Sequence, residues 1–94
     1  VPPHGNLLCA AGFHHPRIRR RAPFDLVCAN ILARPLVQLA PDIARHMTPG
    51  GRLIVSGLYA SQEGYVTTGF RFLGFRRQGR MAVDDWVTLT FQAP

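Results

Sequence analysis

Three short apolar runs, each closed by a polar or small residue, constrain the fold of this chain most strongly. They are Asn6–Ala11, Phe24–Asn30 and Arg52–Ser56, and within each run successive residues are apolar rather than every second one. Runs of about four to eight such residues are typical of parallel strands that are covered on both faces. We therefore predict three buried parallel strands.

Two helices are expected between and after these strands. Leu32, Leu36, Leu39 and Ile43 recur at spacings of four, three and four, which predicts an amphipathic helix that ends before Thr48–Gly51. Pro41 lies within it and should kink or divide it. Residues 59–73 form a weaker helical stretch, and Gly74 is a natural left-handed terminator for it.

The remaining residues predict an antiparallel hairpin at the edge of the sheet. Residues 75–83 and 86–91 can form its strands, joined by Asp84–Asp85, and apolar residues alternate with polar ones in the second strand. The complete order of elements indicates an α/β layered domain with right-handed crossovers. In such sheets ligands bind beyond the carboxyl ends of the strands, here just after Ala11, Asn30 and Ser56.

All 11 cationic residues are arginines, and the net charge is +6. The densest cluster is Arg17, Arg19, Arg20 and Arg21, which could contact the phosphates of RNA or of a ribosome. The alternative is a solvated loop. It is favoured because no Phe, Trp or Tyr is interleaved with these arginines, as is usual in single-stranded nucleic-acid binding.

The apolar runs, the cysteines and the histidines indicate where the protein resides and whether it binds a metal. The chain has no apolar run of the roughly 18 residues that cross a membrane, so no membrane partner is expected. Cys9 and Cys28 lack metal-ligand spacing and are interpreted as small buried side chains in a reduced, cytoplasmic compartment. His14–His15 has no third ligand nearby, so no metal site is expected.

Asn30 is the strongest candidate for a functional side chain. Its amide offers an acceptor and two donors at the end of a strand, where a ligand would lie. The alternative is that Asn30 caps the helix that follows it. The spacing alone leaves both interpretations open.

The stretch from Phe24 to Leu36 strongly resembles the fourth-strand segment of the methyltransferases that modify large-subunit ribosomal protein L11. The resemblance continues through Pro49–Leu58, Gln62–Glu63 and Asp85–Leu89, and so covers nearly the whole chain. Its most specific part is Ala29–Ala33.

This resemblance implies a partial Rossmann-like sheet of the class I type, with S-adenosylmethionine as the cofactor. It places Asn30 beside the methyl donor, and Asn30, Ile31 and Leu32 beside the substrate. The implied reaction is transfer of methyl groups to amino groups of a ribosomal protein, with the acceptor nitrogen held in line with the donor methyl.

Two elements of that family cannot be matched to this sequence. The family binds S-adenosylmethionine through a Gly-rich turn and an acidic residue, whereas Gly50–Gly51 follows a helix and precedes a strand. We therefore expect residues 1–94 to be the C-terminal part of a catalytic domain, with an interior start and no activity in isolation. The family's central strand would be missing, so we expect one edge of Phe24–Ala29 to be open and to associate with another polypeptide.

Overall fold

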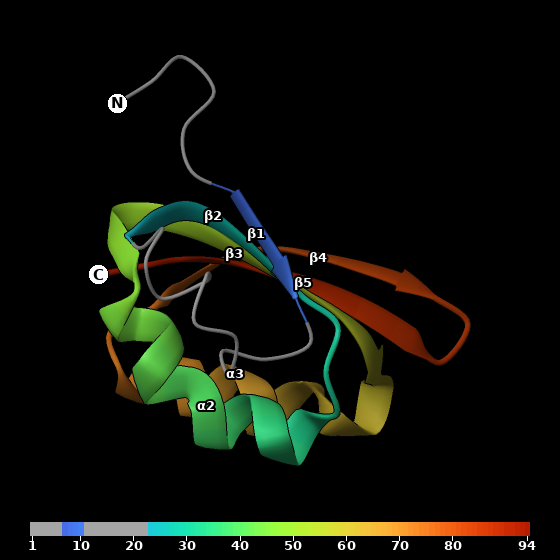
Figure 1. The fold of residues 1–94 in the computed structure, drawn as a ribbon. Helices are drawn as coiled ribbons and strands as arrows, with labels where there is room; N and C mark the ends of the chain where they lie inside the picture. The colour runs from blue at the N-terminus through green and yellow to red at the C-terminus, as the bar shows by residue number, and fades with distance from the viewer. Residues whose placement is uncertain (1–6, 11–22) are drawn as a thin grey trace.

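The computed structural model describes residues 7–10 and 23–94, which form one sheet with helices on one side (Figure 1). The elements, in chain order, are β1 (Leu7–Ala10), β2 (Phe24–Ala29), α2 (Ala33–Arg45), β3 (Met47–Tyr59), the short 3₁₀ helix η1 (Ala60–Gln62), α3 (Glu63–Phe72), β4 (Arg76–Val83) and β5 (Trp86–Gln92).

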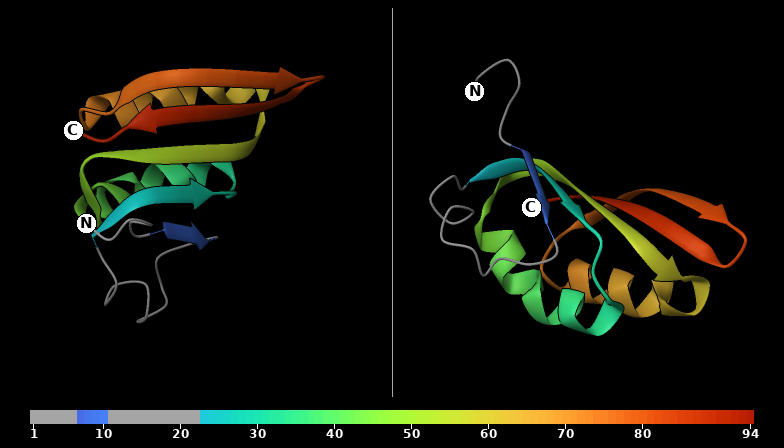
Figure 2. Two further views of the ribbon diagram at one scale, coloured as in Figure 1. Left: turned by 90° about the horizontal axis from the view of Figure 1, so that it is seen from above. Right: turned by 45° about the vertical axis from the view of Figure 1, so that its right-hand side comes forward.

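The sheet has five strands in the order β1-β2-β3-β5-β4. β1, β2 and β3 are parallel, whereas β5 is antiparallel to both of its neighbours, β3 and β4 (Figure 2). The three predicted parallel strands and the terminal hairpin are therefore confirmed. The hairpin adds β5 inside and β4 at the outer edge.

Both helices lie on the same side of the sheet (Figures 1 and 2). α2 turns Ala33, Leu36, Ala40 and Ile43 into the core and continues unbroken through Pro41, so the expected division of this helix is wrong. Among the described residues, the opposite face of the sheet is only partly buried, at Cys28, Ile54 and Thr90 for example. The described helices therefore cover one face of the sheet, and the burial of the other face by the described residues is partial.

The edge of β2 is paired. β1 lies alongside it in parallel, with Leu7 opposite Leu26 and Ala10 opposite Ala29. The expectation of an open edge along Phe24–Ala29 is therefore wrong, because a strand from the same chain satisfies the backbone groups that would otherwise be free. The outer edges of the sheet are formed by β1 and β4.

β3 is longer than predicted and contains an irregularity. The expected strand ended at Ser56, but the observed one continues to Tyr59, and its register with β5 shifts between Val55 and Leu58. Gly57 lies within this shift with φ +78°, a left-handed conformation that glycine adopts without steric cost. The bulge is the point where β3 passes the end of β2.

Glu63 begins α3, and its carboxylate contacts two arginines of β4. Nε of Arg80 donates to both carboxylate oxygens, at 2.8 and 2.9 Å, and Nη2 of Arg77 lies 2.6 Å from Oε2. The hydrogen bond from Arg80 lowers the pKa of Glu63, assisted by the charges of both arginines and opposed by desolvation. These ion pairs fasten the start of α3 to the outer strand.

Replacing Glu63 by glutamine should lower the free energy of unfolding by about 1 kcal/mol at neutral pH, because a partly exposed ion-pair network is lost. The pKa of Glu63 is depressed in the folded state. Its contribution is therefore present above the usual glutamate pKa and is lost as the pH falls through the lowered value. Urea unfolding should show a constant difference between the two proteins above about pH 5, and this difference should shrink as the pH falls below the usual glutamate pKa.

Asp42→Asn is the control for the Glu63 prediction, because it removes the exposed ion pair between Asp42 and Arg45 within one helix. It should change stability by less than Glu63→Gln does. A difference between wild type and Glu63→Gln that stays constant down to the lowest pH would contradict the assignment.

Candidate functional site

Asn30 follows the last residue of β2 and therefore lies at the carboxyl end of the parallel strands. The N-cap of α2 is Leu32, and no side chain caps that helix by a hydrogen bond. Asn30 is thus not the helix cap, which was the alternative interpretation. Its side chain is exposed, and among the described residues it accepts and donates no hydrogen bond.

Gly57 of β3 lies directly against the Asn30 amide. A methyl group at Gly57 would lie 2.3 Å from Oδ1 of Asn30 and 3.4 Å from its Cγ. The distance to Oδ1 is far shorter than van der Waals contact allows, and the distance to Cγ is an ordinary contact, so the two residues occupy adjoining space. The carboxyl end of β2 and the bulge of β3 therefore form one local surface.

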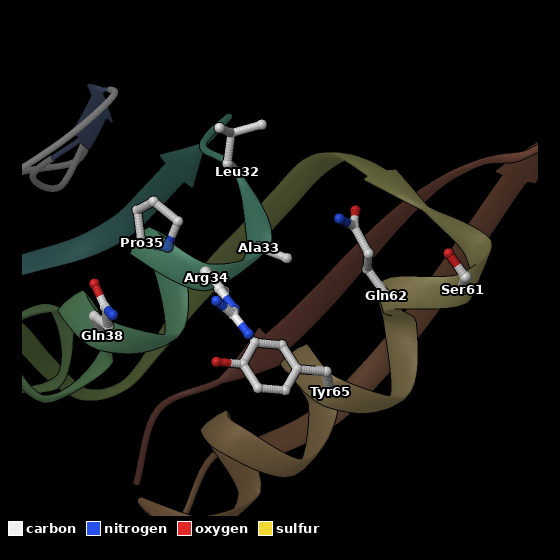
Figure 3. Close-up of a pocket in the computed structure, with 8 residues that line it drawn as sticks. All are labelled: Leu32, Ala33, Arg34, Pro35, Gln38, Ser61, Gln62 and Tyr65. Carbon is white, nitrogen blue, oxygen red and sulfur yellow. The ribbon is translucent and has the colours of Figure 1, made fainter.

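A cavity of about 700 Å³ opens beside this surface, between the start of α2 and the η1–α3 segment (Figure 3). One wall comes from the residues that begin α2, and the other from η1 and the first turn of α3. Its lining residues are Leu32, Ala33, Arg34, Pro35, Gln38, Ser61, Gln62 and Tyr65. The cavity is mostly apolar and carries hydroxyl, amide and guanidinium groups.

The three residues predicted to face the substrate have different surroundings. The side chain of Leu32 is 74% exposed and lines the cavity, whereas Ile31 is partly buried and packs against the hydrophobic core. Asn30 precedes both and lies against Gly57. Of these three successive residues, Asn30 therefore has an exposed amide, Ile31 packs on the core, and Leu32 forms part of the cavity wall.

Sequence reasoning did not identify the second wall of the cavity. Ser61, Gln62 and Tyr65 line it from η1 and α3, and Gln38 joins them from α2. The available signal was the prediction that ligands bind after Ser56, since these residues follow β3 in the chain. The start of α2 lies near η1 and the first turn of α3 only in the folded chain, so the spacing of residues in the sequence does not predict it.

The described lining of the cavity offers apolar contacts and hydrogen-bonding groups. Among residues 7–10 and 23–94, it includes no Asp, Glu, His or Cys side chain, and Arg34, the cation found there, forms no ion pair. A neutral amide at Asn30 can hold a ligand by hydrogen bonds without adding charge.

Several predicted features lie outside the described residues. Arg17, Arg19, Arg20, Arg21 and the pair His14–His15 all belong to the segment 11–22. Within residues 7–10 and 23–94, no three His, Cys, Asp or Glu side chains come together as metal ligands. In the same ranges, no helix has the length and hydrophobicity to cross a membrane.

Sequence comparison gives a family match over almost the entire chain. Residues 8–94 match the family described as "Ribosomal protein L11 methyltransferase (PrmA)". A ribosomal protein L11 methyltransferase of Chelativorans sp. (strain BNC1) is 52% identical over 80 residues, and one of Mesorhizobium japonicum is 46% identical over 80 residues. Each match covers 85% of this chain and 28% of the relative, so the chain spans less than a third of the length of these proteins.

Solved structures give the same picture of the fold. A ribosomal protein L11 methylase of Lactobacillus delbrueckii subsp. bulgaricus superposes with a TM-score of 0.70 at 29% identity, covering 76% of this chain and 38% of that one. The N-methyltransferase NodS of Bradyrhizobium japonicum, in complex with S-adenosyl-L-homocysteine, superposes with a TM-score of 0.58 at 15% identity, covering 89% and 50%. The second likeness concerns the fold alone.

Proposed function

The chain belongs to the ribosomal protein L11 methyltransferase family, and from that premise we propose that it forms the acceptor side of a protein methyltransferase site. In the whole protein, methyl groups would pass from S-adenosylmethionine to amino groups of a large-subunit ribosomal protein. The observation that carries the proposal is the exposed Asn30 amide, which has no hydrogen-bond partner among the described residues and lies at the carboxyl end of β2.

Asn30 is proposed to contact both the donor and the acceptor. Its amide oxygen accepts a hydrogen bond from the acceptor amine, which directs the nitrogen lone pair away from the oxygen and toward the donor methyl. S-adenosylmethionine, when bound, supplies an activated methyl group on a positively charged sulfur. A neutral amide suits this step, because correct placement of the nitrogen is what lowers the barrier.

The cavity beside Leu32 is proposed to receive the acceptor segment. Its apolar walls can hold the methylene groups of a lysine side chain or the backbone near a terminal amine, while Gln38 and Tyr65 offer hydrogen bonds to the peptide. Arg34 gives this entrance positive charge. A neutral amine fits such a surface better than a protonated one, and the neutral form is the nucleophile.

The donor-binding part of the proposal can be tested with a chimera. In it, the part of this chain that aligns over 80 residues with the Chelativorans relative replaces the matching segment of that relative, and the two segments are 52% identical. The chimera should bind S-adenosylmethionine in isothermal titration, and the 94-residue chain alone should bind with a dissociation constant weaker than about 100 μM. A folded chimera that fails to bind, under conditions where the intact relative binds, would contradict the proposal.

A further inference from the structure

Gly57 of β3 lies against the side chain of Asn30, the residue that follows β2, and no hydrogen bond joins the two among the described residues. A methyl group on Gly57 would overlap the Asn30 side chain, at 2.3 Å from Oδ1. Gly57 also has φ +78°, and it lies where the register between β3 and β5 shifts. Two independent features, the backbone conformation and the missing side chain, thus coincide opposite the amide.

We infer that Gly57 is a positioning residue, which admits the Asn30 side chain to the rotamer that the proposed methyl-transfer site requires. The catalytic importance of Gly57 rests on the proposed function, whereas the contact between Gly57 and Asn30 does not depend on that function. Any side chain at position 57 would occupy the space of Oδ1 and turn the amide away. The bulge therefore shapes the site as well as the strand.

The steric overlap of a side chain at position 57 should displace Asn30 and not the residues of the core. Asn30 is exposed, so its tip can rotate into solvent once it is displaced. Gly51 differs, because a methyl group there would meet backbone oxygens of Thr48 and Asp25 at 3.0 and 3.2 Å. Substitution at Gly57 should therefore change amide orientation with only the stability loss that its left-handed backbone imposes.

Gly50 provides a matched control. It has φ +77°, nearly the value at Gly57, but a methyl group there would meet only Nε2 of Gln92, at 3.8 Å. Gly50→Ala and Gly57→Ala should therefore show similar losses in the midpoint of urea unfolding. Only the second should move the Asn30 side chain.

Asparagine-selective ¹⁵N labelling of the full chain allows this to be measured directly. The sequence contains two asparagines, Asn6 and Asn30, so the spectrum has two side-chain amide pairs, and Asn30→Ala assigns them. In Gly57→Ala the Asn30 pair should shift by more than it does in Gly50→Ala. In the wild-type chain, a nuclear Overhauser effect should connect the Asn30 side-chain amide to the α-protons of Gly57.

An unchanged Asn30 resonance in a folded Gly57→Ala protein would overturn the inference. So would the absence of the Overhauser effect in the wild type, a measurement that needs no variant to fold. Neither measurement involves a methyl donor, so either result would leave the proposed function standing. The opposite outcome is also distinguishable. If Gly57→Ala shifts the Asn30 amide, but neither Gly57→Ala nor Asn30→Ala changes donor binding or the transfer rate of the chimera, the proposed function is contradicted and the contact between the two residues stands.

Discussion

Replacing Phe70 by alanine should lower the free energy of unfolding by about 3–5 kcal/mol, a large part of the total for a domain of this size. Phe70 is fully buried on α3, and its ring lies 5.1 Å from that of Phe75 and 5.3 Å from that of Phe91. Its loss leaves a cavity where α3, the residue that precedes β4 and β5 meet. Urea denaturation followed by circular dichroism measures the effect.

Phe72 is the matched control for this prediction. It lies two residues further along α3, and its side chain is 89% exposed. Phe72→Ala should change stability by less than about 0.5 kcal/mol, because little apolar surface leaves water there on folding. Equal losses in the two variants would show that α3 does not pack on the sheet through Phe70.

Replacing Asn30 by alanine in the chimera should lower kcat by about 100-fold or more and leave the folded stability almost unchanged. Misplacement of the reacting groups by about 1 Å already costs a factor of this size. The stability should be retained because the Asn30 side chain is exposed and caps no helix. The rate is measured with tritiated S-adenosylmethionine and the purified ribosomal protein.

Gln78→Ala provides the control for Asn30. It removes an exposed amide on β4, the strand at the far edge of the sheet from β1, and this amide donates a hydrogen bond to Oε1 of Gln92. The rate should stay within about twofold of the unsubstituted chimera, since single surface substitutions have small effects. Comparable losses in both variants would mean that Asn30 has no special role in transfer.

The parallel strands could be predicted from the sequence because their apolar runs are short, continuous and closed by turn residues. The same reasoning located Asn30 at a strand end, since that placement depends only on where the run of Phe24–Ala29 stops. Gly74 was predictable as well, because a helix terminator of this kind needs a left-handed backbone, and its φ is +92°. These features are local in the chain.

Features that depend on distant partners were not predictable from the sequence. The pairing of β1 with β2 replaces the expected open edge, and a run of four residues does not indicate which strand it will join. The contact between Gly57 and Asn30 depends on a bulge that shifts the register of β3. The cavity is formed by the approach of two helix starts, which helical periodicity cannot describe.

The central claim is that these residues supply the acceptor side of a methyl-transfer site, and the initial rate of the chimera with ribosomal protein L11 tests it most directly. With saturating tritiated S-adenosylmethionine, we expect a rate within about tenfold of the intact Chelativorans relative, because the matched segments are 52% identical. Background incorporation by a chimera that is folded and binds the donor would contradict it.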